Sequence, residues 1–117
     1  MPNNNDDKKA NDSLVRHYER YLRLERGYSQ NTILAYMHDI DHLLRYLHNT
    51  GMHVADVKLE DLENFVATLV DVGISPKSQA RILSGVRSFY RYLVLDGYLD
   101  KDPTELLESP NLGEHLP

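Results

Sequence analysis

The chain has 117 residues, no cysteine and a formal net charge of −5, from 13 basic and 18 acidic side chains. This length allows one compact domain, and the lack of cysteine excludes a disulfide scaffold, a cysteine-based zinc site and a thiol nucleophile. No apolar run approaches the roughly 18 residues that span a bilayer and the polar start lacks a signal peptide, so we expect a cytoplasmic protein without membrane contact.

The first residues are rich in Asn, Asp and Lys and show no apolar periodicity. We therefore expect residues 1–11 to form a flexible tail. Asp12 or Ser13 then offers an N-cap for a first helix that runs to about Arg26, and Gly27 follows as the residue that ends it.

The spacing of apolar residues and the residues typical of helix ends predict two further helices. Apolar side chains recur at spacings of three and four between Ser29 and Gly51, which predicts a second helix. A third helix is predicted from Leu59 to Val72, with acidic residues in its first turn, where the positive end of the helix dipole favours them.

The fourth helix has the clearest start, because Ser75 can cap it and Pro76 suits its first position. It continues to about Asp96, and the same pattern predicts a short helix over 102–107. Nothing alternates with period two, so the prediction is all-α: a compact bundle of four main helices plus a short C-terminal helix, over residues 12–108. Residues 109–117 contain two prolines and a glycine and are expected to be a linker.

The acidic net charge argues against a nucleic-acid partner until the charges are located along the chain. Residues 52–73 carry −4 and 96–117 carry −5, whereas 74–95 carry +4 with no acid. In the fourth helix the cations fall on or beside one face, with serines between them, opposite an apolar face. These cations are Lys77, Arg81, Arg87 and Arg91. Like charges four residues apart destabilise a helix, so the pattern favours an anionic partner; an ordinary solvated face is the alternative.

The start of the second helix adds a second polar feature. Ser29-Gln30-Asn31-Thr32 places four hydrogen-bonding side chains beside unsatisfied backbone N–H groups, an arrangement that suits a phosphate. A simple cap, with Ser29 bound to the N–H of Thr32, is the alternative. Together the two features favour a domain that lays two helices against duplex DNA.

The same residues carry a family resemblance. Ser29-x-x-Thr32, Ala35-Tyr36 and Asp39-Ile40 resemble the opening motif of tyrosine site-specific recombinases, "S-x-N-T-x-x-A-Y-x-x-D-L". Residues 75–93 resemble their "S-x-x-S-x-x-R-x-L-S-x-L-R-x-F-Y-x-Y-L" helix. The match runs from about Leu14 to Pro117 and is closest to Xer-type recombinases and related integrases.

The resemblance implies a SAM-like core-binding domain that forms half of a clamp around double-stranded DNA and reads the major groove with its second and fourth helices. Carried over by motif position, the DNA-facing candidates are Ser29, Asn31, Thr32, Tyr36, Lys77, Ser78, Arg81 and Arg87. Lys77 and Arg81 are the strongest, because the helical pattern also exposes them. Arg87 and Tyr36 could instead serve packing or an internal hydrogen bond.

The resemblance also implies that the chemistry lies elsewhere. The family's arginines, lysine, histidines and nucleophilic tyrosine belong to a C-terminal catalytic domain, which we expect to follow the linker and to be absent here. The chain should then bind DNA without cutting it and need no cofactor. Other recombinase protomers are the expected protein partners, as a tetramer on two DNA sites in the full-length protein.

Other interpretations have less support. His38 and His42 have a spacing that can chelate a metal, but no third ligand is evident, so no metal site is predicted. A helical protein-interaction module would account for the acidic surface but not for an acid-free basic helix face. A hydrolase has neither a nucleophile motif nor a glycine-rich phosphate loop in its support.

Overall fold

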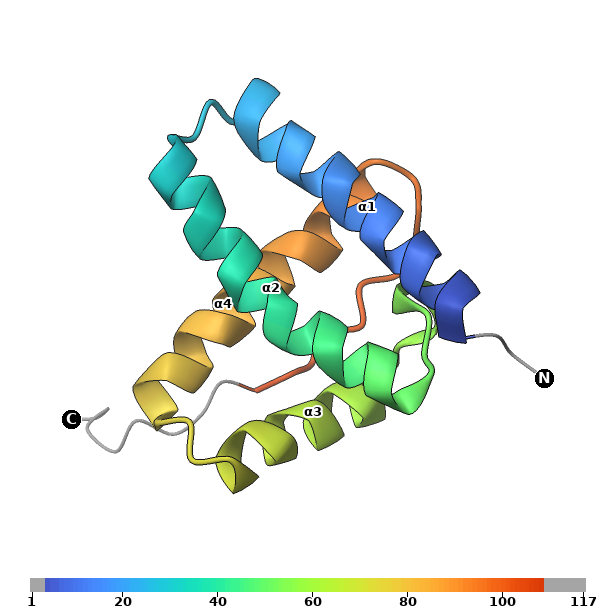
Figure 1. Ribbon diagram of the computed structural model, residues 1–117, viewed down its shortest axis with the longest axis vertical. Coiled ribbons are helices and arrows are strands. Elements are labelled where there is room, and N and C mark those ends of the chain that lie inside the picture. Colours follow the sequence, from blue (N-terminus) through green and yellow to red (C-terminus); the bar gives the residue numbers. More distant parts are fainter. Residues whose placement is uncertain (1–3, 109–117) are drawn as a thin grey trace.

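The computed structural model describes residues 4–108 as an all-α bundle, as predicted. Its elements are α1 (Asn4–Leu24), α2 (Gln30–Thr50), the 3₁₀ helix η1 (Val54–Asp56), α3 (Leu59–Asp71) and α4 (Pro76–Leu95). Figure 1 shows α1 and α2 as an antiparallel pair, with α4 crossing behind α2 and α3 below them. None of these helices is long and apolar enough to cross a membrane.

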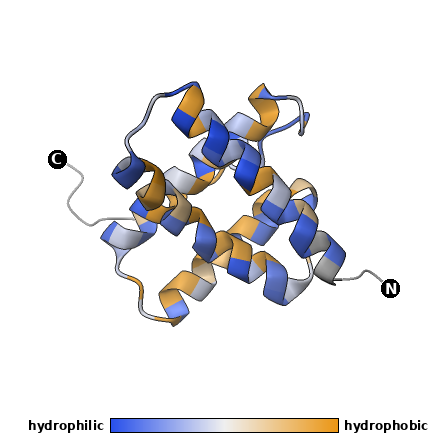
Figure 2. Ribbon diagram, turned by 45° about the horizontal axis from the view of Figure 1, so that its top comes forward, coloured by the Kyte–Doolittle hydropathy of each residue, from blue (hydrophilic) through white to orange (hydrophobic). Residues whose placement is uncertain are grey.

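The core forms around the apolar side of α4, which carries nine buried residues. Its contacts with α2 are the most extensive between any two described elements. The apolar face predicted for this helix is confirmed, because the four side chains on the side opposite the cations are almost fully buried: Ile82, Val86, Phe89 and Leu93. Figure 2 shows the matching pattern on the other helices, which alternate between hydrophobic and hydrophilic stretches. The fourth helix therefore holds the bundle together as well as presenting its basic residues to solvent.

Helix ends that depend on local chemistry lie where the sequence predicts them. The Oγ of Ser29 accepts a hydrogen bond from the Thr32 N–H at 3.2 Å, and Ser75 caps Ser78 in the same way at the same distance. Gly51 follows α2 with a φ of 67°, a conformation that favours glycine. The caps fix where α2 and α4 start, and so where their first turns present polar groups.

The predicted flexible tail is wrong for the residues described, because α1 begins at Asn4 and not at Asp12 or Ser13. Polar side chains stabilise this extension. The Asn11 side chain, only 4% exposed, donates to the Met52 carbonyl at 3.1 Å and accepts from the Val54 N–H at 2.8 Å. A tertiary contact thus orders a segment that lacks apolar periodicity. Residues 1–3 lie outside the described range.

The predicted short helix over 102–107 is also wrong, since this segment forms turns. The Asp102 carboxylate accepts from both the backbone N–H and the hydroxyl of Thr104, at 2.8 and 2.7 Å. The Leu107 N–H then bonds the Thr104 carbonyl at 3.0 Å, a spacing of three residues. Side-chain bonding of this kind competes with helical hydrogen bonds. The predicted linker over 109–117 lies outside the described residues.

Candidate nucleic-acid interface

At the start of α2, two of the predicted site residues bind each other. Ser29 accepts from the Thr32 N–H, and its hydroxyl lies 3.0 Å from the Thr32 hydroxyl, to which it donates. The capping interpretation of Ser29 is therefore confirmed. The Ser29 hydroxyl already donates its proton to Thr32. The Thr32 hydroxyl proton and the exposed Asn31 side chain can still bind a ligand.

At the start of α4, Lys77 is exposed and Ser78 is half-buried. There is no acidic residue in this first turn, so nothing on the helix itself neutralises Lys77. Arg81 follows one turn later, and its side chain is 60% exposed. The helical spacing had predicted this exposure.

The partner of Arg81 was not predicted. Its Nε lies 3.1 Å from Oδ1 of Asp39 on α2, whose side chain is only 9% exposed. Burial raises the pKa of the Asp39 carboxyl above its ordinary value, and the neighbouring Arg81 partly opposes that shift. Asp39 therefore binds the Nε of the Arg81 guanidinium, and no other side-chain partner of Arg81 is found among the described residues.

The two helices approach closely at this point because α4 has a glycine there. A Cβ placed on Gly85 would lie 2.8 Å from the Cβ of Asp39, well inside contact distance. Glycine in the middle of a helix is a sequence signal for close backbone approach, and here it marks the crossing of α2 and α4. That signal could have located the site from the sequence.

A hollow of about 380 Å³ lies along this crossing, and we call it the α2–α4 groove. Eight residues line it: Asn31, Thr32, Ala35, Tyr36, Asp39, Arg81, Ser84 and Gly85. Four of them belong to the predicted site, so the fold brings Asn31, Thr32, Tyr36 and Arg81 to one groove. Ser29, Lys77, Ser78 and Arg87 do not line it. Ala35, Asp39, Ser84 and Gly85 also line the groove but were not predicted as site residues.

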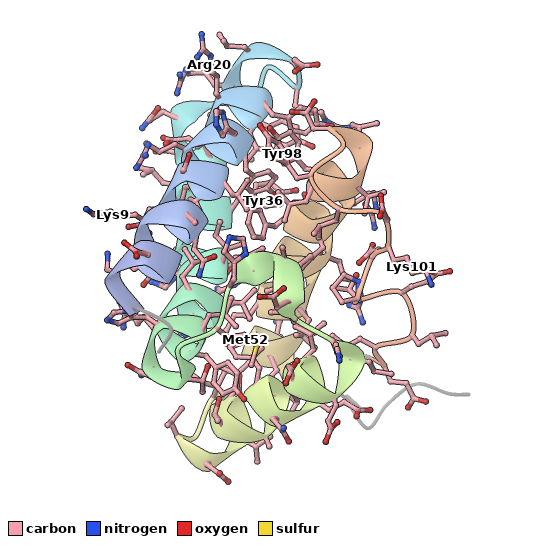
Figure 3. The ribbon with its side chains drawn as sticks, turned by 90° about the vertical axis from the view of Figure 1, so that its right-hand side faces the viewer. Lys9, Arg20, Tyr36, Met52, Tyr98 and Lys101 are labelled. Atoms are coloured by element: carbon pink, nitrogen blue, oxygen red, sulfur yellow. The ribbon has the colours of Figure 1, made fainter. Side chains whose placement is uncertain are left out.

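Tyr36 and Arg87 have internal partners, as the sequence analysis allowed. The Tyr36 ring stacks on Tyr28, with centroids 5.6 Å apart and planes 6° from parallel. Arg87 donates from a terminal nitrogen to the Leu107 carbonyl at 2.7 Å. Figure 3 shows Tyr36 toward the space between the helices, whereas Lys9 and Arg20 point outward from α1.

Comparison with known proteins shows the family of the chain. The model of the family described as "Phage integrase, N-terminal SAM-like domain" matches residues 15–97. Proteins named tyrosine recombinase XerD are similar: that of Staphylococcus haemolyticus is 32% identical over 107 residues, and that of Staphylococcus aureus strain Mu50 is 35% identical over 109. Each alignment covers 91% of this chain and 36% of the relative, so the chain spans about a third of their length. No solved structure matches significantly. The chain therefore belongs to the phage integrase N-terminal SAM-like domain family, within the tyrosine recombinases that its motifs resemble.

Proposed function

We propose that this chain is the DNA-binding domain of a tyrosine recombinase and that it grips duplex DNA through the α2–α4 groove and the basic face beside it. The observation that carries the proposal is that Arg81, exposed on a helix without acidic residues, lines one groove with the polar groups of Asn31 and Thr32, while exposed Lys77 lies one turn before it on α4. Cations and hydrogen-bond donors on two adjoining helices suit a phosphate backbone and the base edges beside it.

Arg81 has the geometry to act as the central contact. Its Nε is bound to Asp39, so the planar guanidinium is oriented before any ligand arrives. The terminal nitrogens can then form a paired hydrogen bond with a phosphate or with a guanine edge in a fixed plane, whereas the Lys77 ammonium is a point charge on a flexible stem. In this proposal Arg81 orients the contact, and Lys77 adds charge one turn away.

The rest of the recombination reaction is assigned to other parts of the protein and to partner molecules. Because the relatives extend well beyond the region matched here, we infer that strand cleavage and rejoining belong to a further domain, and that this chain binds DNA without cutting it. Other recombinase protomers would act with it on two DNA sites. A single domain contacts few phosphates, so its affinity should be weak and should fall steeply with salt.

Fluorescence anisotropy with a labelled duplex tests the proposal. At about 50 mM salt, the wild-type chain should bind, and the Lys77→Glu/Arg81→Glu variant should lose at least tenfold in affinity, because cations facing phosphates become anions. The matched control is Lys9→Glu/Arg20→Glu, which makes the same charge change on the outward face of α1 (Figure 3). Circular dichroism establishes that each variant keeps its helices.

Two results would overturn the proposal. One is an absence of binding by the wild-type chain even at about 50 mM salt. The other is an equal loss of affinity in both double variants, which would trace binding to net charge and not to this groove. A chain that binds no duplex would instead fit a helical protein-interaction module.

A further inference from the structure

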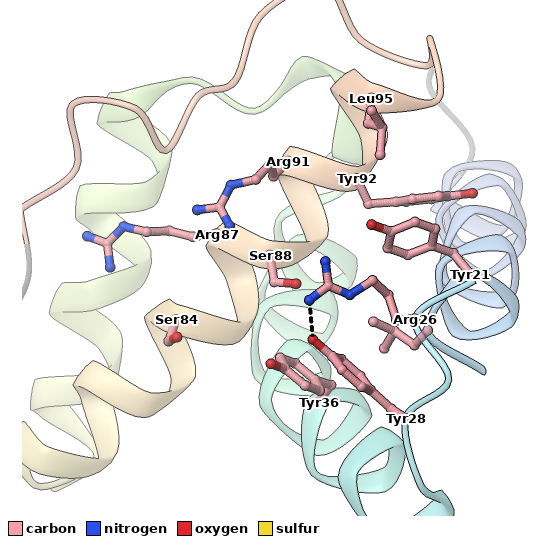
Figure 4. Close-up of a pocket in the computed structure, with 11 residues that line it drawn as sticks. Tyr21, Arg26, Tyr28, Tyr36, Ser84, Arg87, Ser88, Arg91, Tyr92 and Leu95 are labelled. Carbon is pink, nitrogen blue, oxygen red and sulfur yellow. Dashed lines mark hydrogen bonds between the residues drawn. The ribbon is translucent and has the colours of Figure 1, made fainter. Parts of the chain in front are cut away.

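A second hollow, of about 410 Å³, adjoins the α2–α4 groove and shares Tyr36 and Ser84 with it. We call it the arginine hollow. It is lined by α1, the α1–α2 loop, α2 and the C-terminal half of α4 (Figure 4). Its lining includes Arg26, Arg87 and Arg91 and no acidic residue. Three cations around one hollow repel each other, so an anion should be stabilised there.

The described side chains do not neutralise these arginines. Ion pairs within the described part of the chain involve Lys8, Arg45 and Arg81, and none involves Arg26, Arg87 or Arg91. Arg87 is bound to the Leu107 carbonyl, and Arg91 is exposed. The charge of the arginine hollow therefore stays open to an external partner.

Arg26 is held in place although it is exposed. One of its terminal nitrogens donates to the Tyr28 hydroxyl at 2.7 Å, and the Tyr28 ring stacks on Tyr36 (Figure 4). This hydrogen bond raises the pKa of Arg26, whose guanidinium is charged at physiological pH in any case. The stacked tyrosines thus restrict a long side chain that would otherwise lose more rotamer entropy on binding.

The arginine hollow also contains a hydroxyl with a free proton. The buried Tyr18 hydroxyl lies 2.8 Å from Oγ of Ser88, its partner among the described residues. Burial raises the pKa of Tyr18, which keeps its proton, and a buried proton without an acceptor is unfavourable. We therefore assign Tyr18 as the donor. Ser88, which lines the hollow, is then free to donate its own proton to a ligand.

We propose that the arginine hollow is a second phosphate site, which binds a backbone phosphate of the same duplex that occupies the α2–α4 groove. Arg26 and Arg91 supply the charge, and Ser88 supplies a hydrogen bond. Continuity with the groove through Tyr36 and Ser84 makes a DNA phosphate the occupant. A nucleobase is less well matched, because the Tyr28 ring already stacks on Tyr36 and the Tyr21 ring packs at a tilt against Tyr92. This inference rests on the proposed function.

The salt dependence of duplex binding tests the second phosphate site. Each phosphate contact contributes about 0.9 to the slope of log affinity against log salt. The Arg26→Gln/Arg91→Gln variant should therefore show a slope shallower by about 1.8 if both contacts are lost. The matched control is Arg20→Gln/Arg45→Gln, which removes the same charge, from α1 and from the Asp41 ion pair. The control should keep the wild-type slope.

Ser88→Ala separates the hydroxyl from the charges. It should reduce affinity by about tenfold to a hundredfold, the range for one hydrogen bond to a charged group, without changing the salt slope. Inorganic phosphate, followed by NMR shifts of the Ser88 amide, should bind weakly and should be displaced by the duplex.

The possible outcomes distinguish this inference from the proposed function. If Arg26→Gln/Arg91→Gln matches its control while Lys77→Glu/Arg81→Glu loses binding, the second phosphate site is overturned and the proposed function stands. If inorganic phosphate binds at Ser88 and the duplex does not displace it, the hollow serves a free anion and the DNA assignment is overturned. If the wild-type chain binds no duplex, both proposals are overturned.

Discussion

The Asn11 side chain joins two segments that are far apart in the sequence. Its amide bonds the backbone at Met52 and Val54, 41 and 43 residues away, and so attaches α1 to the segment that follows α2. The sequence could not predict this contact, because an Asn in a polar stretch carries no periodic signal. Asn11 therefore accounts for the error in placing the start of α1.

Asn11→Ala should be strongly destabilising for a polar-to-alanine change. It leaves a buried N–H and a carbonyl without partners, each of which costs about 1–3 kcal/mol. We expect the free energy of unfolding, measured by urea denaturation, to fall by about 2 kcal/mol or more. Asn49→Ala, at an exposed position in α2, should change it by less than about 0.5 kcal/mol. Equal effects of the two substitutions would contradict the role of Asn11.

For Arg81, the sequence predicts the exposure of the side chain but not its partner. Its exposure follows from helical periodicity, which is local. Its ion pair with Asp39 joins positions 42 residues apart and depends on how two helices cross. The same limit applies to Arg87. Its hydrogen bond to the Leu107 carbonyl forms only when the turn over residues 102–107 packs beside α4.

At the scale of elements, the crossing of α2 and α4 depends on Gly85. The helices meet where α4 has no side chain, and the Cβ of Asp39 occupies that space. This contact sets the separation of the two helices that line the α2–α4 groove. A change at Gly85 should therefore affect the shape of the groove as well as the stability of the bundle.

Gly85→Ala should be destabilising although alanine favours helices. Alanine gains about 1 kcal/mol in helix propensity over glycine, but overpacking against a backbone-attached atom costs about 1–3 kcal/mol. Thermal unfolding should show a lower midpoint than the wild-type chain, and duplex affinity should also fall. Ser84→Ala, at the adjacent exposed position, serves as the control and should leave the midpoint nearly unchanged. A rise in midpoint for Gly85→Ala would show that the helices separate freely.

Helix boundaries were predictable where a local signal sets them. Ser29 and Ser75 cap the helices that follow them, and each cap lies within only four residues of sequence. Residues 102–107 form a turn and not the predicted helix: Asp102-Pro103 resembles a helix start, but the Asp102 carboxylate bonds Thr104 and closes a turn. Local motifs predict a start, but tertiary contacts decide whether a helix continues.

At the scale of the whole molecule, charge is distributed unevenly. The net charge is −5, yet the lining of the arginine hollow carries only cations among its charged residues. The described part of the chain extends 43 × 39 × 25 Å. Electrostatic screening acts over about 30 Å at roughly 10 mM ionic strength and about 8 Å at 150 mM. The acidic net charge of the whole molecule should therefore repel a DNA duplex only at low salt, because at 150 mM only nearby charges act on it.

This distribution predicts a salt-dependent effect of acidic residues that lie outside the two hollows. Glu60→Gln/Glu63→Gln, two exposed changes on α3, should raise duplex affinity at about 10 mM ionic strength and leave it nearly unchanged at 150 mM. Anisotropy titrations at both salt concentrations measure this difference. An equal gain at both would place these carboxylates close to the bound DNA.

The Asn11 contacts also bear on the order in which the chain folds. Both reach residues more than forty positions away, so they form only after α2 and the turn behind it have come together. Contacts that close such long loops stabilise the chain late in folding, because the entropy cost of closing the loop comes first. The first turns of α1 should then dock near the end of folding, and the strength of their attachment should govern mainly how fast the domain unfolds.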